Sequence, residues 1–236
     1  MLELHGTENE IGIPVAFVEC FWRRGSRHSK DKARDDSGKL MPMRETYPTA
    51  RFLGIVAAGD FTKPARDLIR SREIDLFYVP KDNIIIIKAF FYNGLIMDYP
   101  DNSTETEKWR IVTTFEKTFT SEKKEQVQHS LITQVGIPTI NSYVDRVRAA
   151  LSALPQEIRF ILRQDSTPLI FESLAEASKF LNQPNFRMGK PQKSYLYQIT
   201  FSDGSEFEKT VASLEMLKQL HKQIELLASH LNQITL

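Results

Sequence analysis

Three short apolar runs, each followed by a polar segment, set the strongest limit on how this chain can fold. The runs cover residues 13 to 22, 51 to 58 and 75 to 79, and their β-branched and aromatic residues favour buried strands. After the second run, a glycine turn, a capping threonine and a proline at residues 59 to 64 predict the start of a helix. Strands that alternate with helices predict an α/β fold with a mixed sheet and flanking helices.

We expect this α/β core to occupy residues 1 to 100. The charged segment between the first two runs predicts a helix whose end the sequence leaves open, because Gly38 and Pro42 weaken or stop helices. Residues 84 to 92, IIIIKAFFY, favour a helix that stops at Gly94, although the same isoleucines would also suit a strand.

The second half of the chain predicts two further parts. Residues 101 to 154 have a helical pattern with breaks near residues 120 and 136, which is typical of a helical connector. Residues 155 to 236 contain one order twice: a strand, a turn, a strand, and a helix opened by a serine. A lone hairpin is unstable in water, so this repeat predicts a small α+β domain of ββαββα order with one shared sheet.

The composition limits the classes of function. The 236 residues have a net charge of only +1, so affinity for nucleic acid has to come from local patches. The single cysteine, Cys20, excludes an intramolecular disulfide, and inside an apolar run it suggests a small core residue. No apolar run reaches the roughly twenty residues that span a bilayer, and the first residues lack the order of a signal peptide. These features favour a cytoplasmic protein with no membrane partner.

One acid stands inside the first apolar run, just before a group of cations. Glu19 on a buried strand could hold Mg²⁺ while the cations meet phosphate oxygens, which is the arrangement of a metal-dependent phosphodiester site. A second carboxylate has to help, and Glu10 is the nearest upstream, although no motif specifies it. The alternative is an ordinary ion pair between Glu19 and Arg23 or a helix lysine.

The cations divide into two groups by expected role. Lys30 and Lys32 follow the strand on a helix, two positions apart, so they face different directions and only one can reach the metal. We choose Lys32 as the catalytic lysine, with Lys30 as the second candidate. Solvated helix lysines are the alternative for these two residues. The expected contacts to the DNA backbone are Arg23, Arg24, Arg27 and His28, and a surface for an acidic protein is the alternative for the three arginines.

The next helix carries further basic residues at near-helical spacing, which could extend a DNA-binding surface. The turn before it has a glycine ahead of a helix N-terminus but lacks the glycines and lysine of a nucleotide-binding loop, so we interpret it as structural. The basic residues of this helix are Lys63, Arg66, Arg70 and Arg72.

The segments "VAFVECFWRRGSRHSKDKA", "RFLGIVAAGDFTKPARDLIRS" and "IDLFYVP" resemble restriction-endonuclease-like proteins of the PD-(D/E)xK nuclease superfamily. The resemblance covers residues 13 to 100 and implies a restriction-endonuclease-like core. It gives Glu19 the place of the strand acid and Lys32 the place of a displaced lysine. Residue 21 is Phe where the usual motif has lysine, and no Pro-Asp pair precedes Glu19. A truncated or degenerate nuclease, or one that needs a second subunit, would fit the same pattern.

We therefore expect a Mg²⁺-dependent DNA endonuclease of restriction type with no small-molecule cofactor, acting as a homodimer or with a missing second subunit. The main alternative is a catalytically inactive DNA-binding or protein-interaction module that keeps the nuclease fold. A small-molecule α/β enzyme is the third class. It predicts a nucleotide or acid pocket at the carboxyl ends of the strands and no affinity for DNA.

Overall fold

The computed structural model divides the chain into two compact units, each built from segments that are distant in the sequence. The first unit contains Met1–Val18, Gly38–Leu53 and Val147–Leu236, and the second contains Glu19–Ser37 and Gly54–Arg146. The structure describes residues 1–23, 25–80, 89–91, 93–95, 99–100, 102–162, 168–183 and 194–234.

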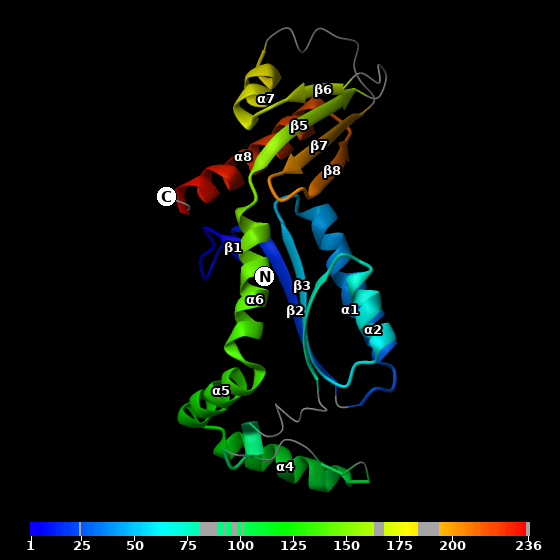
Figure 1. Ribbon diagram of the computed structural model, residues 1–236, viewed down its shortest axis with the longest axis vertical. Helices are drawn as coiled ribbons and strands as arrows, with labels where there is room; N and C mark the ends of the chain where they lie inside the picture. Colours follow the sequence, from blue (N-terminus) through cyan, green and yellow to red (C-terminus); the bar gives the residue numbers. More distant parts are fainter. Residues whose placement is uncertain are drawn as a thin grey trace. The chain divides into compact units, whose positions relative to one another are not determined.

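The first half of the chain forms a four-stranded mixed sheet in the order β1-β2-β3-β4 (Figure 1). β1 is antiparallel to β2, whereas β3 and β4 are parallel. Backbone hydrogen bonds from Arg51 to Val15 and from Asp60 to Arg23 run in the same sense, so β2 and β3 are parallel as well. The elements of this half are β1 (Leu2–Leu4), β2 (Ile13–Arg23), α1 (Ser29–Thr46), β3 (Phe52–Gly59), α2 (Lys63–Arg70) and β4 (Asp75–Pro80).

The alternation of strands and helices confirms the predicted α/β class with a mixed sheet and flanking helices. Thr62 caps α2 by accepting a hydrogen bond from the backbone N–H of Ala65, as the sequence predicts. α1 continues through Gly38 and Pro42, so neither residue ends it. Residues 89–91 are helical, and the rest of the isoleucine-rich segment lies outside the described residues.

Cys20 is exposed, so the prediction that it is a core residue is wrong. Trp22, two positions further along β2, is exposed as well. Side chains two residues apart share one face of a strand, so this end of β2 leaves one of its faces open to solvent. Its apolar sequence alone did not reveal which face is covered.

Three helices follow the first sheet: α4 (Glu105–Thr118), α5 (Ser121–Val135) and α6 (Ile137–Ser152). The breaks between them fall where the sequence predicts them, because Thr120 caps α5 and Gly136, at φ 90°, ends it. None of the helices in the described part of the chain is long and apolar enough to cross a membrane.

The last third has the element order that the repeat predicts, two hairpins each followed by a helix (Figure 1). All neighbouring strands of its sheet are antiparallel, in the order β6-β5-β7-β8. Ser173 and Ser213 accept hydrogen bonds from the first turns of the two helices. The elements are β5 (Pro155–Leu162), β6 (Pro168–Phe171), α7 (Leu174–Leu181), β7 (Tyr195–Phe201), β8 (Glu206–Val211) and α8 (Leu214–Ile234).

One face of this second sheet carries an apolar core. Along β7 every second side chain is buried: Tyr195, Tyr197, Ile199 and Phe201. This period of two is what a strand with one covered face requires, and α8 contributes apolar side chains to the same core. This core is thus mostly apolar, with His221 as a buried polar residue of α8.

A buried arginine joins the start of β3 to the β7–β8 hairpin within the first unit. The guanidinium of Arg51 lies 3.3 Å from the ring centre of Phe201, and its Nη2 donates to Ser205 Oγ at 2.6 Å. Asp203 lies 3.6 Å away and is the nearest charge of opposite sign. Burial lowers the pKa of Arg51 to about 10, against the attraction of Asp203.

Candidate functional site

Glu19 lies on the side of β2 that faces α1. Phe21, two residues further along, contacts the ring of Phe61 with 5.0 Å between ring centres and lies 5.4 Å below the ammonium of Lys32 on α1. Because side chains two residues apart on a strand point to the same face, Glu19 is directed toward α1 too. Its side chain is half-buried. The strand therefore presents its acid to the helix and not to bulk solvent.

The helix that covers this face is unusually polar. The buried side of α1 contains Ser29, Asp36 and Ser37 together with Ala33 and Leu40. Helices packed on a sheet normally bury an apolar stripe, and a buried polar group destabilises the fold unless it is hydrogen-bonded. The layer between β2 and α1 therefore contains groups suited to polar chemistry in place of a simple apolar contact.

Lys32 connects the buried part of this layer to its open side. Its Nζ donates to Oδ1 of Asp36 at 2.8 Å, and the Asp36 side chain is fully buried whereas that of Lys32 is 33% exposed. Lys30 is exposed and lies on another side of the helix, as its spacing predicts. Of the two lysines, Lys32 is the one that lies against the strand carrying Glu19.

The carboxyl ends of β2 and β3 approach each other closely at Gly59, where there is no room for a side chain. Gly59 has φ 103°, and a Cβ there would lie 1.9 Å from the carbonyl oxygen of Arg23. The hydroxyl of Tyr78 donates to the carbonyl oxygen of Gly59 at 2.9 Å. Ser29 and Thr62 meet with 3.1 Å between their hydroxyl oxygens, so the first turns of α1 and α2 lie side by side. These contacts support the interpretation of this turn as structural.

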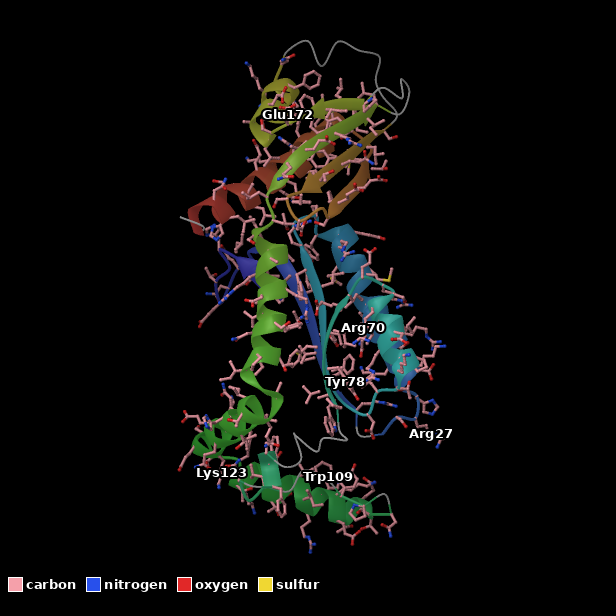
Figure 2. The ribbon with its side chains drawn as sticks, viewed as in Figure 1. Arg27, Arg70, Tyr78, Trp109, Lys123 and Glu172 are labelled. Atoms are coloured by element: carbon pink, nitrogen blue, oxygen red, sulfur yellow. The ribbon has the colours of Figure 1, made fainter. Side chains whose placement is uncertain are left out.

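The four residues expected to contact the DNA backbone are in different environments. Nη2 of Arg23 donates to the carbonyl oxygen of Arg27, so its guanidinium is held within the loop and not against Glu19. Arg27 itself is exposed (Figure 2). His28 is exposed in a left-handed conformation, with Nδ1 3.3 Å from Asp31. Arg24 lies outside the described residues.

Glu10, the expected second carboxylate, lies in the turn between β1 and β2 and is exposed. The backbone N–H of Glu10 donates to the hydroxyl of Thr7, and the backbone N–H of Thr7 donates to the carbonyl oxygen of Glu10. Glu10 belongs to the first compact unit and Glu19 to the second. The carboxylate on the helix opposite β2 is Asp36, which the sequence did not single out.

Three cations follow one stripe of α2. Lys63 is exposed, as is Arg70 (Figure 2). The guanidinium of Arg66 lies 4.7 Å from the ring centre of Tyr78. Arg70 also has a loose ion pair of 3.7 Å with Asp67. Their spacing of three and four residues places them on one side of the helix. This stripe is a basic surface that starts at the carboxyl end of β3 and follows α2 toward the start of β4.

Arg72 does not belong to that basic surface. Its Nη1 donates to the buried hydroxyl of Ser37 at 2.6 Å and to the carbonyl oxygen of Arg34 at 3.0 Å. It therefore fixes α1 to the end of α2. The prediction that Arg72 extends the exposed basic face is wrong, because helical spacing does not hold beyond the last turn of α2.

The donor set of this layer suits a hard cation in part. Mg²⁺ commonly takes one or two protein carboxylates and completes its coordination with water and substrate phosphates. Glu19 on β2 offers one such carboxylate, whereas the buried carboxylate of Asp36 on α1 is bound by the ammonium of Lys32. Within the part of the chain that the structure describes, no group of three or more histidine, cysteine, aspartate or glutamate side chains is placed to hold a metal.

A second polar cluster, missed by the sequence, lies in the C-terminal domain. The ring of His221 is 2.8 Å from the hydroxyl of Tyr197 through Nδ1 and 2.8 Å from that of Ser178 through Nε2, and Ser178 donates to Glu225. Burial raises the pKa of Tyr197 and lowers that of His221, which favours the neutral forms of both groups. Nε2 also lies 3.3 Å from the carbonyl oxygen of Leu174, which can only accept, so a proton on Nε2 and an Nδ1 that accepts from Tyr197 fit these contacts.

Comparisons with protein-family models, with curated proteins and with solved structures found no match for this chain. The function has to be argued from the geometry of the layer between β2 and α1.

Proposed function

We propose that this chain is a metal-dependent DNA endonuclease of restriction type, in which Glu19 helps to hold Mg²⁺ and Lys32 stabilises the reacting phosphate. The observation that supports this most is the place of the Lys32 ammonium. It lies 5.4 Å above the ring of Phe21, the residue that stands where the nuclease motif has its lysine. The nuclease motif has a lysine two residues after the strand acid, and this strand has Phe21 there. The ammonium of Lys32, from α1, lies beside that position.

Hydrolysis of a phosphodiester needs an activated water and stabilisation of the negative charge that develops on the phosphate. Water attacks the phosphorus and loses a proton to the solvent, and the five-coordinate phosphorus that forms carries more negative charge than the bound diester. The bond to the leaving oxygen then breaks, and that oxygen takes a proton from the solvent. Bound Mg²⁺ would supply Lewis acidity and a more acidic water. The Lys32 ammonium donates to a non-bridging phosphate oxygen, and a partly buried cation is effective there because little water screens it.

The basic stripe of α2 supports DNA as the substrate. Lys63 and Arg70 face solvent, and the guanidinium of Arg66 is already oriented by the ring of Tyr78. Arg27 precedes α1 at the same edge of the sheet. Because the chain as a whole has almost no net charge, a local group of cations is what would attract a phosphate backbone. Each cation that contacts phosphate should contribute about 0.9 to the slope of log K against log salt.

The test is cleavage of supercoiled plasmid with Mg²⁺ or Mn²⁺ by the wild type and by Glu19→Gln, Lys32→Met and Asp35→Asn. Asp35 is an exposed carboxylate on the same helix, so its variant is the matched control. We expect Glu19→Gln and Lys32→Met to cleave at least about 100-fold more slowly, and Asp35→Asn to cleave like the wild type. A wild type that never cleaves, or a Glu19→Gln variant that is fully active, would remove the proposal.

The second candidate is an inactive DNA-binding module that keeps the fold, and the phenylalanine at position 21 favours it. This module would bind duplex DNA with a steep salt dependence, lose affinity in Arg66→Gln and Arg70→Gln, and cleave nothing. A flat salt response would exclude both candidates, since phosphate contacts release counterions whether or not cleavage follows.

A further inference from the structure

We infer that Asp36 is a positioning residue, which acts on the proposed reaction by holding the ammonium of Lys32 above Phe21. The inference rests on the proposed nuclease function. Asp36 Oδ1 accepts from Lys32 Nζ at 2.8 Å and the carboxylate is fully buried, whereas the lysine is partly open to solvent. The buried member of the pair is therefore the fixed one, and the open member is the one that a substrate could reach.

The pair is poorly suited to a role in stability alone. A solvent-exposed pair at positions i and i+4 contributes only about 0.2–0.5 kcal/mol, and the order with lysine first is the weaker one. Burying the carboxylate of Asp36 removes its hydration, and a buried ion pair is often no more stabilising than apolar side chains of the same volume. A helix that only had to cover β2 would be at least as stable with leucine or methionine at these two positions.

The surroundings of Asp36 fix where Lys32 can go. The next residue, Ser37, donates to the carbonyl oxygen of Ala33 and accepts from Arg72, so this turn of α1 is anchored to the end of α2. The ring of Phe21 forms the floor below the ammonium. A lysine has several rotatable bonds and three N–H donors. One donor is used by Asp36, which leaves two for a phosphate oxygen and a water.

This arrangement predicts a defined kinetic signature. A lysine that is free to move would still be attracted to DNA, so binding should change little, whereas the reacting geometry should be reached less often. Misplacing a catalytic group by about 1 Å can slow a reaction by about 100-fold. Asp36→Asn, which keeps the shape and removes the charge, should therefore lower kcat by about 10- to 100-fold with KM altered by less than about threefold.

The experiment measures kcat, KM and the pH profile of plasmid cleavage for the wild type, Asp36→Asn, Asp36→Glu and the control Asp35→Asn, with folding checked by circular dichroism. Asp36→Glu keeps the charge and moves it by one methylene. We expect it to recover part of the rate lost in Asp36→Asn. It also serves as the test variant if Asp36→Asn does not fold.

The outcomes separate the two levels of the proposal. A wild type without cleavage removes the nuclease function and this inference with it. A wild type that cleaves, together with folded Asp36 variants whose kcat equals that of Asp35→Asn, overturns the inference alone. A fall in kcat in Asp36→Asn at an unchanged KM, with partial recovery in Asp36→Glu, supports it, because a purely structural role would not depend on the charge in this way.

Discussion

The layer between β2 and α1 and the core of the C-terminal domain are built on opposite principles. In the C-terminal domain, every second residue of β7 is apolar and buried, and α8 adds apolar side chains to the same core. On α1, the buried side contains Ser29, Asp36 and Ser37. Both are helix-on-sheet contacts, yet only one of them follows the pattern that burial of apolar surface favours.

This difference indicates where in the chain to look for function. An apolar core needs no explanation beyond the free energy of burial. A polar contact in the same structural position is less favourable for folding, which is why we look there for a use other than stability. The following variants test whether the two regions differ in this way.

The largest effect is expected in the apolar core. Phe160 is fully buried and its ring stacks on Tyr197 with 5.4 Å between ring centres. Phe160→Ala should lower the free energy of unfolding by about 3–5 kcal/mol, because it removes buried apolar contacts and leaves a cavity. Urea denaturation measures it, and a change below about 1 kcal/mol would mean that this core is not packed as described.

A smaller loss is expected at the buried arginine. Arg51→Met keeps an apolar contact with Phe201 but removes the hydrogen bond to Ser205 and the charge beside Asp203. We expect a loss of about 2 kcal/mol in the free energy of unfolding, the usual range for hydrogen bonds from charged groups. Asp203→Asn should lower the free energy of unfolding by less, since the carboxylate of Asp203 is partly exposed. Equal losses in the two variants would show that the ion pair, and not the hydrogen bond from the buried guanidinium to Ser205, accounts for the effect.

The buried histidine should make stability depend on pH. Burial lowers the pKa of His221. The charge of Glu225 and the hydrogen bond to the carbonyl oxygen of Leu174 raise it, but by less. The unfolded chain therefore binds a proton to this residue at a higher pH than the folded chain does. Its contribution to stability is present above the ordinary histidine pKa of about 6.5 and is lost as the pH falls through that region.

The titratable neighbours of His221 are Tyr197 on β7 and Glu225 on α8, with Ser178 and the carbonyl oxygen of Leu174 on α7. Melting temperatures should fall toward the acid end when they are measured between pH 5 and 8. This range extends about one and a half pH units on either side of the ordinary histidine pKa. The fall should be smaller in His221→Gln, which keeps a neutral polar side chain. Equal slopes in both proteins would exclude His221 as the cause.

The smallest effect is expected in the polar layer. The double variant Lys32→Met/Asp36→Leu replaces a buried ion pair by apolar side chains of similar volume, and it should be between unchanged and about 2 kcal/mol more stable than the wild type. The same denaturation experiment measures it. A loss as large as that of Phe160→Ala would show that the pair is structural after all and would end the contrast between the two regions.

The sequence predicted those parts of the fold in which local pattern and tertiary packing agree. The alternation in β7, the capping serines and the helix break at Gly136 all carry their structure in neighbouring residues. α1 was harder to delimit because Gly38 and Pro42 oppose a helix locally, while buried Ala33 and Leu40 hold it against the rest of the fold.

The candidate site was predictable only in part. A run of apolar residues with one acid identified Glu19, and helical spacing separated Lys32 from Lys30. Asp36 was missed because its role depends on which side of α1 meets the strand, and the helix has no apolar stripe that would reveal it. Its spacing of four residues from Lys32 was the available signal. The prediction for Cys20 was wrong because apolar neighbours in the sequence do not show which face of β2 is covered near its carboxyl end.

The central claim is that the ammonium of Lys32 does the work of a lysine on the strand at position 21. The most direct test is the rate of Mg²⁺-dependent plasmid cleavage by Lys32→Met and by the double variant Lys32→Met/Phe21→Lys. We predict that Lys32→Met cleaves at least about 100-fold more slowly than the wild type and that the double variant cleaves at least about tenfold faster than Lys32→Met. If Lys32→Met cleaves at the wild-type rate, or if the double variant cleaves no faster than Lys32→Met, the claim is wrong.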